Sequence, residues 1–275
     1  MLSFIGALLL LLAGVIVYKK RFTAGTKIGG LYWIQLYYLF LTPIGALLMF
    51  DVGSDIFSRP HLVNLPVPGN ILFNLYNFSV MMIVVGMGIH STSTSVYQSF
   101  KNRDKSEKEA YHTNELIHGP WSHNMSQLGA MFSVILLGLL ELNHPYSGRI
   151  INFNFLLMAG IFLGTLGTIS ILRSTFISFP LIAAFIGSLV LGYGLKTYAT
   201  NFYSYPMATI ATLGVLTMFV LLSLASIIFA VSEKWSKKIV KRAFPKGHRF
   251  HQGIDIKVLT MRIEKEFAQE REVRF

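Results

Sequence analysis

Four of the chain's eight histidines fall within a stretch of 34 residues that is rich in polar side chains. They are His90, His112, His118 and His123, and Glu115 lies three residues from both His112 and His118. A spacing of three places side chains on one face of a helix. Imidazole nitrogen and carboxylate oxygen together suit Zn²⁺, Fe²⁺ or Mn²⁺. The stretch therefore predicts a divalent metal site, with iron or zinc as the expected ion.

The Glu-x-x-His element in this stretch is the one by which helical di-iron carboxylate proteins supply ligands. If residues 110–118 form a helix, the Gly-Pro pair that follows ends it, and His123 can fold back toward His118. His90 would then join from a neighbouring helix. We expect acid–base roles for Glu115 and His123. The predicted metal ligands are His90, His112, Glu115, His118 and His123.

Other interpretations fit the same residues without a metal. Histidines at a membrane surface bond to lipid phosphates or cap helices, and Trp121 is typical of an interfacial anchor. The loop could also dock on a partner protein, or the polar cluster could stabilise the fold. The hydroxyl run Ser91–Ser95 lacks the sharp Gly-x-Ser-x-Gly turn of a serine hydrolase. We expect Ser91 and Thr94 only to line a pocket with His90.

Seven long apolar runs must position these residues. Each is about 17–26 residues long, and a helix needs roughly 20 residues to cross about 30 Å of hydrocarbon. No charged residue lies near the middle of any run. The pattern predicts an all-α, seven-helix membrane bundle over residues 1–232. The runs are Leu2–Tyr18, Leu31–Phe50, Ile71–His90, Met125–Leu142, Phe153–Leu172, Ile177–Leu195 and Pro206–Val231.

Composition agrees with a membrane domain. Hydrophobic residues make up 53% of the chain and charged residues 13%, about half the charged share of a soluble protein. The absence of cysteine excludes disulfides, thiolate metal sites and cysteine nucleophiles. Pro43 is expected to kink the second run. Gly160 and Gly164 have the spacing that lets two helix backbones approach closely, which predicts helix packing or a homo-oligomer through this face.

The positive charges predict an orientation. With the N-terminus outside, the inner segments hold four Lys or Arg after the first run, four after the third, Arg173 and twelve in the tail. The outer loops hold only Arg59, Arg149 and Lys196, so 21 of the 24 positive charges lie inside. The expected location is the cell membrane, with a basic cytoplasmic tail at 233–275. Topology and anionic inner-leaflet lipid account for the net charge of +11, so nucleic acid is not an expected partner.

This orientation places the histidine-rich stretch at the inner membrane surface. We therefore expect an integral membrane enzyme that acts on a lipid or isoprenoid substrate through its His/Glu cluster. One alternative is a transporter or channel-like protein, for which Asn70, Asn74 and Asn77 would line a path. The other is a non-catalytic subunit of a larger membrane complex.

Overall fold

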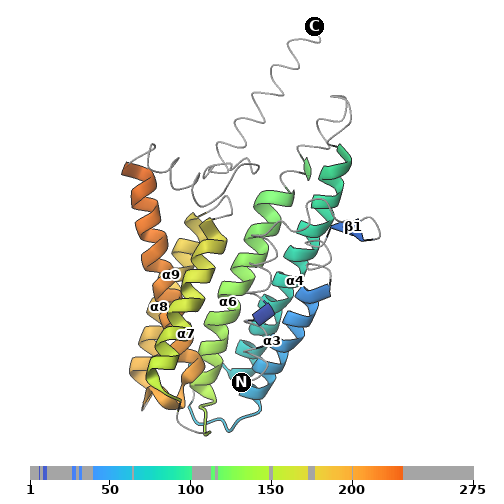
Figure 1. Cartoon of the computed structure of the whole chain (residues 1–275). Helices are drawn as coiled ribbons and strands as arrows, with labels where there is room; N and C mark the ends of the chain where they lie inside the picture. The colour runs from blue at the N-terminus through green and yellow to red at the C-terminus, as the bar shows by residue number, and fades with distance from the viewer. Residues whose placement is uncertain are drawn as a thin grey trace.

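The computed structural model describes residues 6, 9–10, 27–28, 31–32, 40–63, 65–100, 113–114, 117–148, 151–172, 177–199 and 201–231. In this part of the chain, six α-helices form an elongated bundle (Figure 1). Two short helical turns and one pair of two-residue strands accompany them. The α-helices are α3 (Thr42–Phe57), α4 (Gly69–Phe100), α6 (Ser122–Asn143), α7 (Phe153–Leu172), α8 (Ser178–Tyr198) and α9 (Pro206–Val231).

Five of these helices, α4 and α6 to α9, are long and apolar enough to cross a membrane. They correspond to the third to seventh predicted runs, and the bounds of α7 and α9 coincide with the prediction. Large apolar side chains on the outside of the bundle support a lipid environment, because soluble proteins rarely expose contiguous apolar surface. Phe78, Met158, Leu189 and Ile227, on four different helices, are all more than half exposed.

The second predicted run differs from the structure. Leu31 and Tyr32 form strand β2 (Leu31–Tyr32), which pairs antiparallel with β1 (Lys27–Ile28). The sequence between the two strands is Gly-Gly, a pair that favours a two-residue hairpin turn. Helix α3 is described from Thr42 to Phe57, which is 16 residues or about 24 Å, and residues 33–39 of the predicted run lie outside the described residues. Pro43 lies in the first turn of α3, a position that proline tolerates, and the predicted kink stays a prediction.

Several predictions fall outside the described residues. The first predicted run is described only at Gly6, Leu9 and Leu10, and the basic tail at 233–275 is not described. Gly6 lies against Leu48 and Leu10 against Gly45, so these parts of the first run contact α3. The count of seven spans and the side on which each terminus lies remain predictions.

Helix α6 lies at the centre of the bundle (Figure 1). It packs along α4 on one side and against α8 and α9 on the other, while α7 packs mainly on α9. Gly69 at the start of α4 lies near His144 just after α6, and His90 near the end of α4 lies near Ser122 at the start of α6. The two helices are therefore antiparallel. We call the end that holds His90 the histidine end and the opposite one, where α6 carries Glu141, the glutamate end.

The predicted close approach at Gly160 and Gly164 occurs within this chain. Both glycines are buried, and both face α9. A Cβ at Gly164 would collide with the carbonyl oxygen of Gly214, and one at Gly160 would meet the side chain of Leu213. An oligomer built through this pair would have to displace α9.

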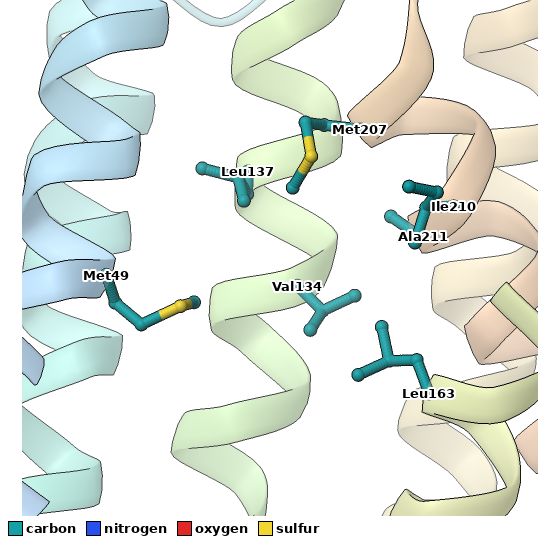
Figure 2. Close-up of a pocket in the computed structure, with 7 residues that line it drawn as sticks. All are labelled: Met49, Val134, Leu137, Leu163, Met207, Ile210 and Ala211. Carbon is teal, nitrogen blue, oxygen red and sulfur yellow. The ribbon is translucent and has the colours of Figure 1, made fainter. Parts of the chain in front are cut away.

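A small, partly open apolar pocket lies where α3, α6, α7 and α9 meet (Figure 2). Its lining side chains are all apolar, and none of them can transfer a proton. Met49 and Leu163 face it from α3 and α7, across the central helix α6. The lining residues are Met49, Val134, Leu137, Leu163, Met207, Ile210 and Ala211.

Candidate metal centre

Three of the predicted histidines meet at the histidine end. His90 lies on α4, and His123 is the second residue of α6. His118 lies between them in sequence, on the π-helical turn η3 (Ile117–Trp121), which leads directly into α6. All three side chains are half-buried, between the bundle interior and its surface.

The π-helical turn explains why His118 and His123 can share a site. In an α-helix, residues five apart are separated by about 140° around the axis, because each residue turns by about 100°. A π-helical turn closes from residue i to i+5 and brings such residues nearer to one face. The predicted helix end at Gly119-Pro120 is therefore wrong, since the backbone continues through these residues into α6.

The three imidazoles are close enough to share one ion. One nitrogen from each of His90, His118 and His123 lies within 4.8 Å of the others. The ring of His90 stacks on that of His118, with centroids 4.3 Å apart and planes at 25°. The centroid of His123 is 4.6 Å from that of His90 and 6.0 Å from that of His118. The arrangement offers three nitrogen ligands, one each from α4, η3 and α6.

Two buried serines connect the histidines in a crossed pattern. Ser93 Oγ donates a hydrogen bond to the carbonyl oxygen of His90 at 3.1 Å and lies 2.9 Å from Nδ1 of His118. Ser122 Oγ donates to the carbonyl oxygen of His118 and lies 3.4 Å from Nδ1 of His90. Each serine thus contacts the backbone of one histidine and the ring of the other.

Close packing of α4 on α6 makes these contacts possible. Gly86 lies one turn before His90, and a Cβ on Gly86 would come within 2.7 Å of Ser126 N and 2.9 Å of Ser122 O. Only glycine permits this separation of the two backbones. Asn114 adds a tie from the preceding segment, because its buried Nδ2 donates to the carbonyl oxygen of Ser93 at 3.0 Å.

The structure brings together three of the five predicted ligands. His112 and Glu115 lie outside the described residues, so their part in the site stays a prediction. Ser91 is buried, and its predicted place in a pocket lining stays a prediction. Sequence reasoning missed Ser93 and Ser122, since their pairing with the histidines depends on how α4 packs on η3 and α6. The spacing of Ser93 three residues after His90 was the one available signal.

The glutamate end holds a second polar cluster of different character. The Glu141 side chain is completely buried and accepts hydrogen bonds from Arg59 Nη1 at 3.2 Å and from the backbone N–H of Ala208 at 2.8 Å. That N–H belongs to the first turn of α9, where a carboxylate is favourable. Arg59 also binds the exposed Asp55 at 2.7 Å. These contacts join α3, α6 and α9 into one network.

His144 lies beside this network, bonded through Nδ1, and its buried Nε2 has no hydrogen-bond partner among the described residues. Its Nδ1 donates to the carbonyl oxygen of Arg59 at 2.8 Å, and its ring is 5.3 Å from that of the exposed His61. Asn143 Oδ1 accepts from the backbone N–H of Leu65 at 3.2 Å. Within the described residues, the group of His, Asp and Glu able to hold a metal is the histidine trio at the other end. Comparisons of the chain with protein-family models, with curated proteins and with solved structures found no match.

Proposed function

We propose that the chain is an integral membrane enzyme that binds a divalent metal ion through His90, His118 and His123 and acts on a lipid or isoprenoid substrate. The observation that carries the proposal is the convergence of three imidazole nitrogens within 4.8 Å. Three ligands from a protein leave a fourth tetrahedral position for water or substrate, which is the pattern of catalytic zinc sites.

The spacing of the nitrogens fits this use after a small adjustment. Tetrahedral ligands at about 2.0–2.1 Å from zinc lie roughly 3.3 Å from one another. If the half-buried rings rotate so that their nitrogens move by about 1–2 Å, the nitrogen–nitrogen separation falls from 4.8 Å to the tetrahedral value. An ion held there would polarise a carbonyl or phosphoryl oxygen, or lower the pKa of a bound water. Glu115 is the proposed acid–base residue and His112 a proposed further ligand, while His123, expected from the sequence in both roles, serves here as a ligand.

The surroundings of the trio support an amphiphilic substrate. Trp121, on the same turn as His118, is 67% exposed, and Ile117 is 40% exposed. These side chains flank the site, which lies near the end of the apolar span of α4 (Gly69–Ser93) and at the start of α6. A substrate with its chain among lipids and its head group near the trio would meet both surfaces. In the proposed orientation, N-terminus outside and seven spans, this end faces the cytoplasm.

Metal analysis of the purified protein tests the proposal. The comparison is between the wild type, the double variant His118→Ala/Glu115→Ala and the matched control His61→Ala, which removes an exposed histidine at the glutamate end. The wild type and the control should each hold about one zinc or iron ion per chain, and the double variant should lose it. A wild type that binds no metal, or a double variant that keeps it, overturns the metal centre.

Turnover then separates the enzyme from its alternatives. The metal-loaded protein is placed in vesicles of native lipid, and lipid products are followed by mass spectrometry. Product formed by the wild type and His61→Ala but not by the double variant supports the enzyme. Metal binding without any change in the lipids favours the transporter or the non-catalytic subunit.

A further inference from the structure

We propose that Ser93 and Ser122 are positioning residues that hold His118 and His90 in the tautomer with the proton on Nδ1, so that both rings present Nε2 to a shared divalent cation. This inference rests on the proposed metal centre and names two residues that sequence reasoning did not connect with it. It also specifies which ring nitrogen binds.

Both serine hydroxyls donate their protons to backbone carbonyl groups. A serine hydroxyl carries one proton and can accept through its remaining lone pairs. Ser93 donates that proton to the carbonyl oxygen of His90, and Ser122 donates its proton to the carbonyl oxygen of His118. Each serine oxygen therefore meets the nearby ring nitrogen as an acceptor.

The serine contacts determine which ring nitrogen of His118 and His90 carries the proton. His118 Nδ1 lies 2.9 Å from Ser93 Oγ, and His90 Nδ1 lies 3.4 Å from Ser122 Oγ. With the serine oxygens as acceptors, both Nδ1 atoms must donate. A neutral imidazole has one N–H, so its lone pair is then on Nε2. The shorter contact makes the assignment strongest for His118.

Both serine side chains are buried. Ser93 is 3% exposed and Ser122 is fully buried, so bulk water does not compete for either hydroxyl. Metal-binding histidines almost always donate their other N–H to an oxygen, which fixes both tautomer and ring orientation. The crossed pattern has a further consequence. Because each serine contacts both histidines, ordering one ring also orders the backbone that carries the other.

The tautomers can be measured before any metal is added. The full-length protein is labelled with ¹⁵N-histidine in detergent micelles at a pH where imidazole is neutral, and long-range ¹H–¹⁵N correlation spectra identify the protonated nitrogen. Signals are assigned with His90→Gln and His118→Gln. We expect Nδ1–H for both histidines in the wild type. Nε2–H at His118 in the folded, metal-free wild type overturns the inference, and this outcome requires no serine variant.

Serine variants then test the cause. Ser93→Ala should release His118 toward the Nε2–H form and weaken Zn²⁺ binding by about 10–100-fold, measured by competition with a zinc-binding dye. Ser126→Ala is the matched control, because Ser126 also donates to a histidine carbonyl, that of His123 at 3.1 Å, and within the described residues its hydroxyl contacts no ring nitrogen. Ser93→Thr keeps the hydroxyl and should retain the wild-type tautomer.

The two proposals fail in different ways. If His90 and His118 are Nδ1–H but the wild type binds no Zn²⁺, the positioning role of the serines stands and the metal centre is wrong. If Zn²⁺ binds with unchanged affinity in Ser93→Ala and Ser122→Ala, the metal centre stands and the positioning role is overturned. Equal losses in Ser93→Ala and Ser126→Ala also overturn it, since they indicate a general packing effect.

Discussion

The two ends of the bundle hold polar side chains for different reasons. At the glutamate end, the buried carboxylate of Glu141 has an opposite charge in Arg59 and a backbone donor in Ala208. At the histidine end, three groups of the same kind converge, and two of them lie within hydrogen-bonding distance of a serine hydroxyl. The carboxylate of Glu141 and the guanidinium of Arg59 neutralise each other within the fold. Three imidazoles that converge can offer their nitrogen lone pairs to one cation.

The difference extends to what each end would do with a proton or an ion. Three imidazoles within 4.8 Å would repel one another if all were protonated, so one divalent cation is a better occupant than three protons. The Arg59–Glu141 pair, in contrast, already has its counter-charge, and an added ion would have to break it. The glutamate end therefore stabilises the fold, and the histidine end is the candidate for chemistry.

The largest expected effect is at the glutamate end. Glu141→Ala leaves Arg59 and the Ala208 N–H without their acceptor in a buried setting, which should lower the free energy of unfolding by about 3–5 kcal/mol. Thermal unfolding in detergent measures the change. In the fraction that remains folded, Zn²⁺ affinity should match that of the wild type. A stable Glu141→Ala protein that loses metal would reverse the roles assigned to the two ends.

A smaller effect is expected where α4 meets α6. Gly86→Ala places a methyl group within 2.7 Å of Ser126 N, so the two helices must move apart. Overpacking of this kind should destabilise the protein by about 1–3 kcal/mol and also weaken Zn²⁺ binding, because the trio spans both helices. Unfolding curves and zinc titrations on the same samples give the two values.

Gly88 provides the matched control two residues away. A Cβ at Gly88 meets no atom of the described chain within 4 Å, so Gly88→Ala should gain helix stability of up to about 1 kcal/mol. Its Zn²⁺ affinity should not change. If Gly86→Ala behaves like Gly88→Ala, close packing of α4 on α6 is not what positions the histidines.

The features that could be predicted are those that depend on residues close together in the sequence. Apolar length is a local property, and five predicted runs appear as helices apolar enough to span a membrane. His90, His118 and His123 were also identified, because their residue type and clustering are visible in the chain. The proposed cytoplasmic side of the site depends on the charge count, which the structure does not test.

The features that were missed depend on tertiary contacts or on unusual backbone geometry. Arg59 and Glu141 are 82 residues apart, so their pairing cannot be read from a local pattern. The π-helical turn at His118 changes which residues share a face, and the Gly-Pro pair within this turn led to a wrong prediction of a helix end. The hairpin before α3 was hidden by an apolar run that continues through Leu31 into the helix.

The smallest expected effect tests whether burial or charge makes the glutamate end stable. Arg59 contacts two carboxylates, Glu141 with a fully buried side chain and Asp55 with a side chain 58% exposed. Asp55→Asn removes only the exposed pair, which water and salt screen, so it should cost no more than about 0.5 kcal/mol. The difference from the wild type should shrink further in high salt, as measured by thermal unfolding in both conditions. A loss as large as that of Glu141→Ala would mean that the total charge around Arg59 matters and the buried geometry does not. A small, salt-sensitive loss would instead locate the stabilisation in the contact that joins α6 to α9.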